Sequence, residues 1–121
     1  MTLSKAILNA DETRRNEIKE ETKREWIEEL DRLIWREVIC THEGEHGEMP
    51  TYTFASDEDE LLAADPYSVI YPRYIVMKID EGTQELGKFN NSSAAFNRSY
   101  EEFTAWYNRT HMPLQEAKIR V

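Results

Sequence analysis

Residues 26–38 read WIEELDRLIWREV, and the apolar letters in this run recur at intervals of three and four. This spacing is that of one face of an α-helix. The face consists of Trp26, Ile27, Leu30, Leu33, Ile34 and Val38. Charged residues fill the other face, and neither Gly nor Pro interrupts residues 17–41. We therefore predict a long amphipathic helix over about residues 17–41.

Two further helical patterns lie nearer the ends of the sequence. Residues 3–10 place Leu3, Ile7 and Leu8 on one side of a short helix. Over about residues 92–109, aromatic residues recur at intervals of four, three and four. They are Phe96, Tyr100, Phe103 and Tyr107. An aromatic stripe of this kind is typical of a helix that packs on a hydrophobic core.

The segment after Asp65-Pro66 is apolar on more than one side. Asp65 suits the cap of a helix and Pro66 suits its first position. One stripe consists of Tyr67, Ile70, Tyr71, Tyr74 and Ile75. Val69 and Val76 fall on the opposite side, so we expect this helix either to be central or to meet a neighbouring subunit. Pro72 would kink the helix unless the helix begins later than Pro66.

Two stretches lack helical periodicity. Residues 43–60 contain two glycines, one proline and the acidic run DEDE, which predicts a long irregular loop. Residues 114–121 follow Pro113 and form a C-terminal tail. The expected fold is therefore an all-α bundle of three to four helices. We expect residues 1–113 to form a single helical domain.

The composition narrows the classes of function. The chain has 121 residues, with 15 Lys and Arg against 24 Asp and Glu, and a net charge of -9. Residues 1–60 hold 8 basic and 17 acidic side chains, so the whole excess lies in the first half. This balance disfavours nucleic-acid binding, because the phosphates would be repelled. No apolar run approaches the roughly 18–20 residues that span a bilayer, and the single cysteine, Cys40, excludes an internal disulfide.

One run matches a catalytic motif. His42-Glu43-Gly44-Glu45-His46 fits the H-E-x-x-H pattern of zinc proteases, in which two histidines one helical turn apart bind the metal and the glutamate acts as the base. Gly44 lies inside this run, so we expect the helix to fray there. We treat His42 and His46 as a chance match, and we expect no catalytic residue, no metal ligand and no cofactor.

Several residues have no evident place in a core and are candidates for protein interfaces. They are Trp35, Ile39, Tyr52, Phe54, Val69, Val76, Lys118, Ile119, Arg120 and Val121. Trp35 and Ile39 fall on the polar face of the long helix, so they either contact another chain or are covered by the loop that follows. The tail residues either become ordered on a partner or stay disordered.

Six short motifs follow one another along residues 17–113. They are EVICTHE at 37–43, ELL at 60–62 with Pro66-Tyr67 and Tyr71 after it, KID at 78–80, FNNS at 89–92, FN at 96–97 and WYNRTHMP at 106–113. Together they resemble a family of small proteins encoded in the head-to-tail joining region of tailed bacteriophages and prophages of Gram-positive bacteria. The last motif is the most specific. Pro72 and the loop with Gly44 and Gly47 depart from the family pattern.

The resemblance implies a structural role, because members of this family look similar to head–tail connector (adaptor) proteins. These are small all-helical subunits that form a ring beneath the portal. By this analogy the chain is made in the host cytoplasm and ends in the neck of the virion, between the portal protein and a downstream neck or tail protein. The ring is homo-oligomeric, a dodecamer by analogy, and DNA passes through it without specific binding. The resemblance implies neither catalysis nor contact with a membrane.

Two other functions stay open. The acidic first half fits an acidic DNA mimic, or a regulatory protein that binds a basic partner. The His42-Glu43-x-x-His46 match fits a minimal zinc metalloprotease, provided that a third metal ligand exists.

Overall fold

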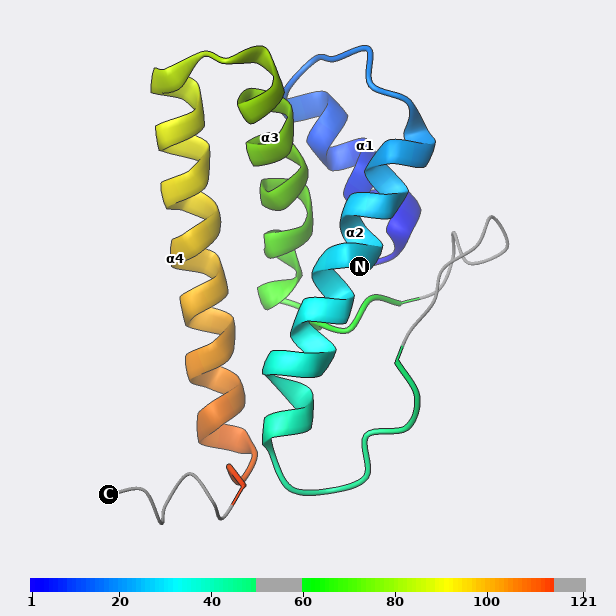
Figure 1. The fold of residues 1–121 in the computed structure, drawn as a ribbon, viewed down its shortest axis with the longest axis vertical. Helices are drawn as coiled ribbons and strands as arrows, with labels where there is room; N and C mark the ends of the chain where they lie inside the picture. Colours follow the sequence, from blue (N-terminus) through cyan, green and yellow to red (C-terminus); the bar gives the residue numbers. More distant parts are fainter. Residues whose placement is uncertain (50–59, 115–121) are drawn as a thin grey trace.

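The fold is that of a computed structural model, which describes residues 1–49 and 60–114. Its four α-helices are α1 (Leu3–Thr13), α2 (Glu20–Glu37), α3 (Ile70–Thr83) and α4 (Leu86–Thr110). Two single-turn 3-10 helices, η1 (Ile39–Thr41) and η3 (Tyr67–Val69), follow α2 and precede α3. The described residues contain no strand beyond two isolated bridges. The expected small all-α bundle is therefore confirmed (Figure 1).

Helix α3 is the centre of the bundle. It packs against α4, α1 and α2, and it runs antiparallel to α4 (Figure 1). Gln84 and Glu85 join α3 to α4, and Gln84 takes a left-handed conformation with φ of 59°. Of the two positions expected for the helix after Asp65-Pro66, the central one is observed, and a contact with a neighbouring subunit stays a prediction.

Apolar side chains from all four helices share one core. The fully buried large ones are Leu3, Ile27, Leu30, Ile34, Ile70, Tyr71, Ile75 and Phe103. Two leucines that the helical patterns assigned to buried faces lie outside this core, since Leu8 is 56% exposed and Leu33 is 37% exposed. On α1 the buried side is completed by Ala6 and Ala10, whose small side chains let α1 approach its neighbours.

A buried polar network ties α2 to α3. Asp31 is fully buried on α2, and the hydroxyl of Tyr71 on α3 donates a hydrogen bond of 2.6 Å to its carboxylate. The same hydroxyl accepts the backbone N–H of Ala63 at 2.7 Å, and the N–H of Leu62 lies 3.3 Å from the other oxygen of Asp31. The network therefore fixes the chain entering α3, because buried polar groups must find such partners.

The helix boundaries differ from the sequence pattern at several points. α2 ends at Glu37 and continues only as the short turn η1, so the predicted helix over 17–41 is shorter at both ends. α4 begins at Leu86, several residues before the predicted start near residue 92. Gly87 and the Asn90-Asn91 pair, which are poor helix formers, lie within α4, because packing of α4 on α3 outweighs their local preference.

Pro72 does not kink α3. The helix begins at Ile70 after η3, so Pro72 lies in its first turn, where the backbone N–H has no intrahelical acceptor to lose. We expect Pro72→Ala to change the free energy of unfolding by less than about 1 kcal/mol. Urea denaturation measures this, with Tyr74→Pro, which removes a real helical hydrogen bond, as the strongly destabilised reference. A large loss for Pro72→Ala would contradict this placement.

Candidate functional site

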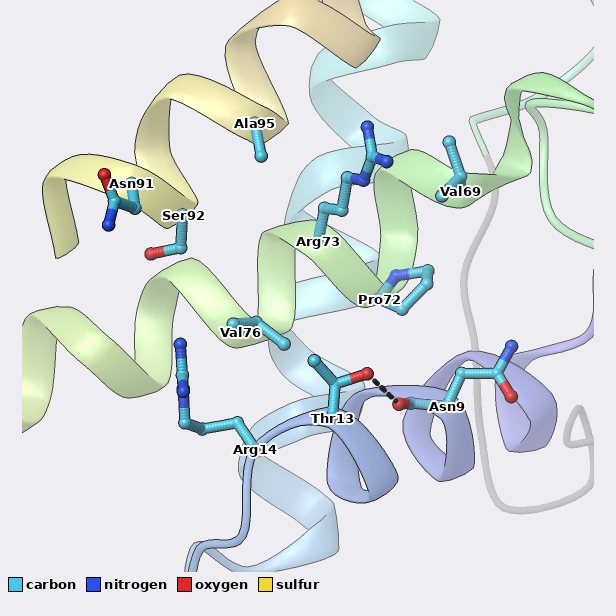
Figure 2. Close-up of a pocket in the computed structure, with 10 residues that line it drawn as sticks. All are labelled: Asn9, Thr13, Arg14, Val69, Pro72, Arg73, Val76, Asn91, Ser92 and Ala95. Carbon is cyan, nitrogen blue, oxygen red and sulfur yellow. Dashed lines mark hydrogen bonds between the residues drawn. The ribbon is translucent and has the colours of Figure 1, made fainter. Parts of the chain in front are cut away.

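A groove of about 470 Å³ lies over α3, between α1 and α4 (Figure 2). Ten residues line it: Asn9, Thr13 and Arg14 from α1, Val69, Pro72, Arg73 and Val76 from η3 and α3, and Asn91, Ser92 and Ala95 from α4. We call this hollow the α3 groove. No residue of α2 lines the groove, and α2 passes behind α3 in the view of Figure 2.

The floor of the α3 groove is apolar. Val69, Pro72 and Val76 follow one another at intervals of three and four along η3 and α3 and therefore share a face. Val76 is 7% exposed and Val69 is half-buried. The turn that carries Val69 is held by Asp65, whose carboxylate accepts a hydrogen bond from the Ser68 hydroxyl. This bond lowers the pKa of Asp65.

The rim of the α3 groove is cationic. The Arg14 guanidinium forms a bidentate ion pair with the buried carboxylate of Asp80, with Nε 2.9 Å from Oδ1 and Nη2 3.1 Å from Oδ2. Arg73 is exposed and donates to the hydroxyl of Ser99 on α4. None of the ten lining residues is acidic, although the chain has 24 Asp and Glu. Because the charge of Arg14 is already paired with Asp80, Arg73 is the exposed cation beside the apolar floor.

The sequence pointed to Val69 and Val76, and the structure brings these two together in the α3 groove. It does not bring Trp35 or Ile39 there. Trp35 is half-buried, and its indole N–H donates to the carbonyl of His46 at 3.5 Å, while Ile39 packs against the core. The loop that follows α2 therefore reaches Trp35, and a contact of Trp35 with another chain stays a prediction. The other candidate interface residues, Tyr52, Phe54, Lys118, Ile119, Arg120 and Val121, lie outside the described residues.

The H-E-x-x-H run has neither the helix nor the free histidines that zinc binding requires. Residues 42–46 are not helical, and Gly44 has a φ of 113°. The ring of His42 is buried, with Nδ1 2.5 Å from the carbonyl oxygen of Val38 and Nε2 2.7 Å from the side-chain oxygen of Asn108. Nε2 of His46 lies 2.7 Å from the backbone oxygen of His42. Across residues 1–49 and 60–114, no three His, Cys, Asp or Glu side chains form a group able to hold a metal.

His42 instead belongs to a clasp that holds the chain after α4. The N–H of Glu43 donates to the carbonyl of Met112 at 2.8 Å, and the N–H of Leu114 donates to the carbonyl of Thr41 at 2.9 Å. The ring of Tyr107 meets that of His42 edge-on at 4.7 Å and stacks on His111 at 3.8 Å. Burial raises the pKa of the Tyr107 phenol. The clasp thereby fixes the point from which the tail leaves the bundle.

A second apolar hollow, of about 230 Å³, lies at the α3–α4 turn. Its lining residues are Asp80, Glu81, Gln84, Glu85, Leu86 and Phe89, and we call this region the α3–α4 tip. Leu86 is 72% exposed, more than any other large apolar side chain in the described part of the protein. Sequence reasoning missed the tip because it placed the start of the last helix after Leu86. It also missed Arg14 and Arg73, since no periodic pattern marks the rim of a groove built from three helices.

Comparison with known proteins gives no family and no relative for this chain. The chain matches no protein-family model, no curated protein and no solved structure. Among the described helices, none has the length and apolar character to cross a bilayer. The α3 groove, with its apolar floor and two arginines, is therefore the feature on which a functional assignment depends.

Proposed function

We propose that the chain is a structural protein of a tailed-phage virion, without catalytic activity. In this role it forms a ring-shaped head–tail connector between the portal and the next neck or tail protein. The α3 groove carries the proposal, because its apolar floor includes the half-buried Val69 and is left open although α3 is the central helix of the bundle. The motif resemblance over residues 17–113 supports the same role.

A ring requires two different surfaces on each subunit, because each copy meets one neighbour with one patch and the other neighbour with another. The α3 groove supplies an apolar, cation-rimmed surface on one side of the bundle. The outer face of α2 is a separate surface, since α2 contributes no residue to the groove and lies behind α3 in Figure 2. Two distinct surfaces on one subunit suit a ring in which every subunit makes the same contact with its neighbour.

The distribution of charge agrees with a channel through which DNA slides. The first 60 residues carry the entire net charge of -9. Within them, Glu20, Glu21, Glu25 and Glu29 are exposed along the first part of α2. A wall of this kind repels phosphates and so keeps DNA from binding tightly.

The same carboxylates favour a second candidate function, an acidic DNA mimic or regulatory protein that binds a basic partner. This alternative predicts tight binding to a basic host protein that weakens steeply with added salt. A pull-down from host lysate at low and high salt, with Glu21→Lys/Glu25→Lys as the control, tests it. If no basic protein is retained, or if the variant retains it equally, this alternative is wrong.

For the connector, we expect Val69→Glu to lower incorporation of the protein into purified virions by roughly tenfold or more, equivalent to ~1.4 kcal/mol of contact energy. The reason is that a carboxylate at this half-buried position places a charge against the apolar floor. Quantitative mass spectrometry of purified particles measures the effect. Circular dichroism checks that the helices remain.

Ala105→Glu is the matched control, since Ala105 is an exposed α4 residue outside the groove and also becomes a glutamate. It should leave incorporation unchanged. Absence of the wild-type chain from purified particles would show that the connector role is wrong. Normal incorporation of the Val69→Glu chain would show that the groove is not a subunit contact.

A further inference from the structure

The α3–α4 tip presents an apolar surface with a partly acidic rim. Leu86 is 72% exposed, and it borders the hollow together with the half-buried Phe89. Glu81 and Glu85 are exposed on the rim. Glu85 also pairs with Lys88 at 2.8 Å, but both partners of this pair are about half exposed. A surface pair of this kind contributes little and leaves Glu85 available to another cation.

The backbone holds Leu86 away from the core. Gln84 lies in the left-handed region with φ of 59°, and Glu85 is extended before α4 begins at Leu86. A left-handed conformation is unfavourable for a residue with a side chain and persists only where the surroundings impose it. The two-residue turn therefore places Leu86 at the end of the bundle, where it is exposed.

The sequence after Leu114 has the complementary chemistry. Lys118, Ile119, Arg120 and Val121 alternate between cationic and apolar side chains. In an extended segment this alternation places the two cations on one side and the two apolar side chains on the other. The apolar side matches Leu86 and Phe89, and the cationic side matches the carboxylates of the rim.

These residues cannot reach the tip of their own chain. The clasp fixes Leu114 through its N–H bond to Thr41, at the end of α4 opposite the tip (Figure 1). The 25 residues of α4 span about 37 Å at 1.5 Å per residue. Residues 115–121 reach at most about 25 Å when fully extended. An occupant of the tip with this sequence must therefore come from a second copy.

We propose that residues 118–121 of one copy dock on the α3–α4 tip of a second copy, with Ile119 and Val121 against Leu86 and Phe89, and with Lys118 and Arg120 against Glu81 and Glu85. Each copy then gives one segment and receives one, and such a head-to-tail contact forms a ring where the rotation between copies closes. The place of this contact in a neck ring rests on the proposed function. The contact itself is a property of the purified chain.

Fluorescence anisotropy with a labelled peptide of residues 113–121, titrated with the full chain, tests the proposal. We expect saturable binding to the wild-type chain, and binding weaker by roughly tenfold or more to Leu86→Ser, which is ~1.4 kcal/mol. The Glu81→Lys/Glu85→Lys chain should also bind the wild-type peptide at least about tenfold more weakly. It should bind instead a peptide with Lys118→Glu and Arg120→Glu, because the charges are then exchanged.

Leu8→Ser is the control for nonspecific hydrophobic binding, since Leu8 is an exposed leucine on α1 outside the tip. It should bind the peptide as the wild type does. No saturable binding to the wild-type chain, equal binding to Leu86→Ser, or failure of the charge exchange would overturn the proposal. Such a failure leaves the connector role intact, because that role is tested by the composition of virions. A chain absent from virions that still binds the peptide would refute the connector role alone.

Discussion

Asp31→Ala is expected to lower the free energy of unfolding by about 3–5 kcal/mol, because it leaves two buried donors without an acceptor, at roughly 1–3 kcal/mol each. Asp31 is fully buried at the centre of the contact between α2 and α3. The substitution leaves the hydroxyl of Tyr71 and the N–H of Leu62 without this acceptor. It also leaves a cavity where the carboxylate was.

Urea denaturation followed by circular dichroism measures this loss. Glu25→Ala is the matched control, because Glu25 is an exposed carboxylate of the same helix, and its removal should change stability by less than ~0.5 kcal/mol. Tyr71→Phe should fall between the two, at about 1–2 kcal/mol, since it removes only the hydroxyl. An Asp31→Ala chain as stable as the Glu25→Ala chain would show that the network does not hold the bundle together.

The burial of Asp31 is a feature of this fold that the sequence pattern does not predict. The three- and four-residue spacing in residues 26–38 correctly predicts an amphipathic helix, because burial of an apolar stripe is a local property of the pattern. Asp31 belongs to the polar face by that pattern, yet it is fully buried. Its burial depends on Tyr71, which is 40 residues away and which no local pattern connects to it.

The misplaced leucines and helix ends have the same cause. Leu8 and Leu33 fit apolar faces by spacing, but the width of each buried face is set by the neighbouring helices. The start of α4 at Leu86 is fixed by its packing on α3 and by the tight turn at Gln84. Local propensity predicted a later start, because Gly87 and Asn90-Asn91 disfavour a helix.

Only part of the candidate site could be predicted from the sequence. Val69 and Val76 were identified because they are apolar on the side of a helix opposite its main stripe, and this is a local signal. The α3 groove exists only because α1 and α4 flank α3, so Arg14 and Arg73 acquire their role from the assembled bundle. The α3–α4 tip depended on a helix boundary that the pattern misplaced.

The second large effect is expected for His42→Ala, which should lower the free energy of unfolding by about 2–3 kcal/mol. The imidazole of His42 is 3% exposed and contacts the Val38 carbonyl, the Asn108 side chain and the ring of Tyr107. Its loss removes the side chain around which the clasp is built. The N–H of Leu114 should then exchange with solvent faster, because its bond to Thr41 loses this support.

His46→Ala separates a structural role for His42 from the metal-binding alternative. His46 is half-buried, and its ring hydrogen-bonds the carbonyl of His42 within the described part of the chain, so its removal should lower stability by less than about 1 kcal/mol. A zinc site would behave differently, because both histidines would be ligands and added zinc would stabilise the wild-type chain by mass action. Urea denaturation of the wild type and both variants, with and without zinc, distinguishes the two. Equal losses for the two variants, together with stabilisation of the wild type alone by zinc, would show that residues 42–46 form a metal site and that the clasp is secondary.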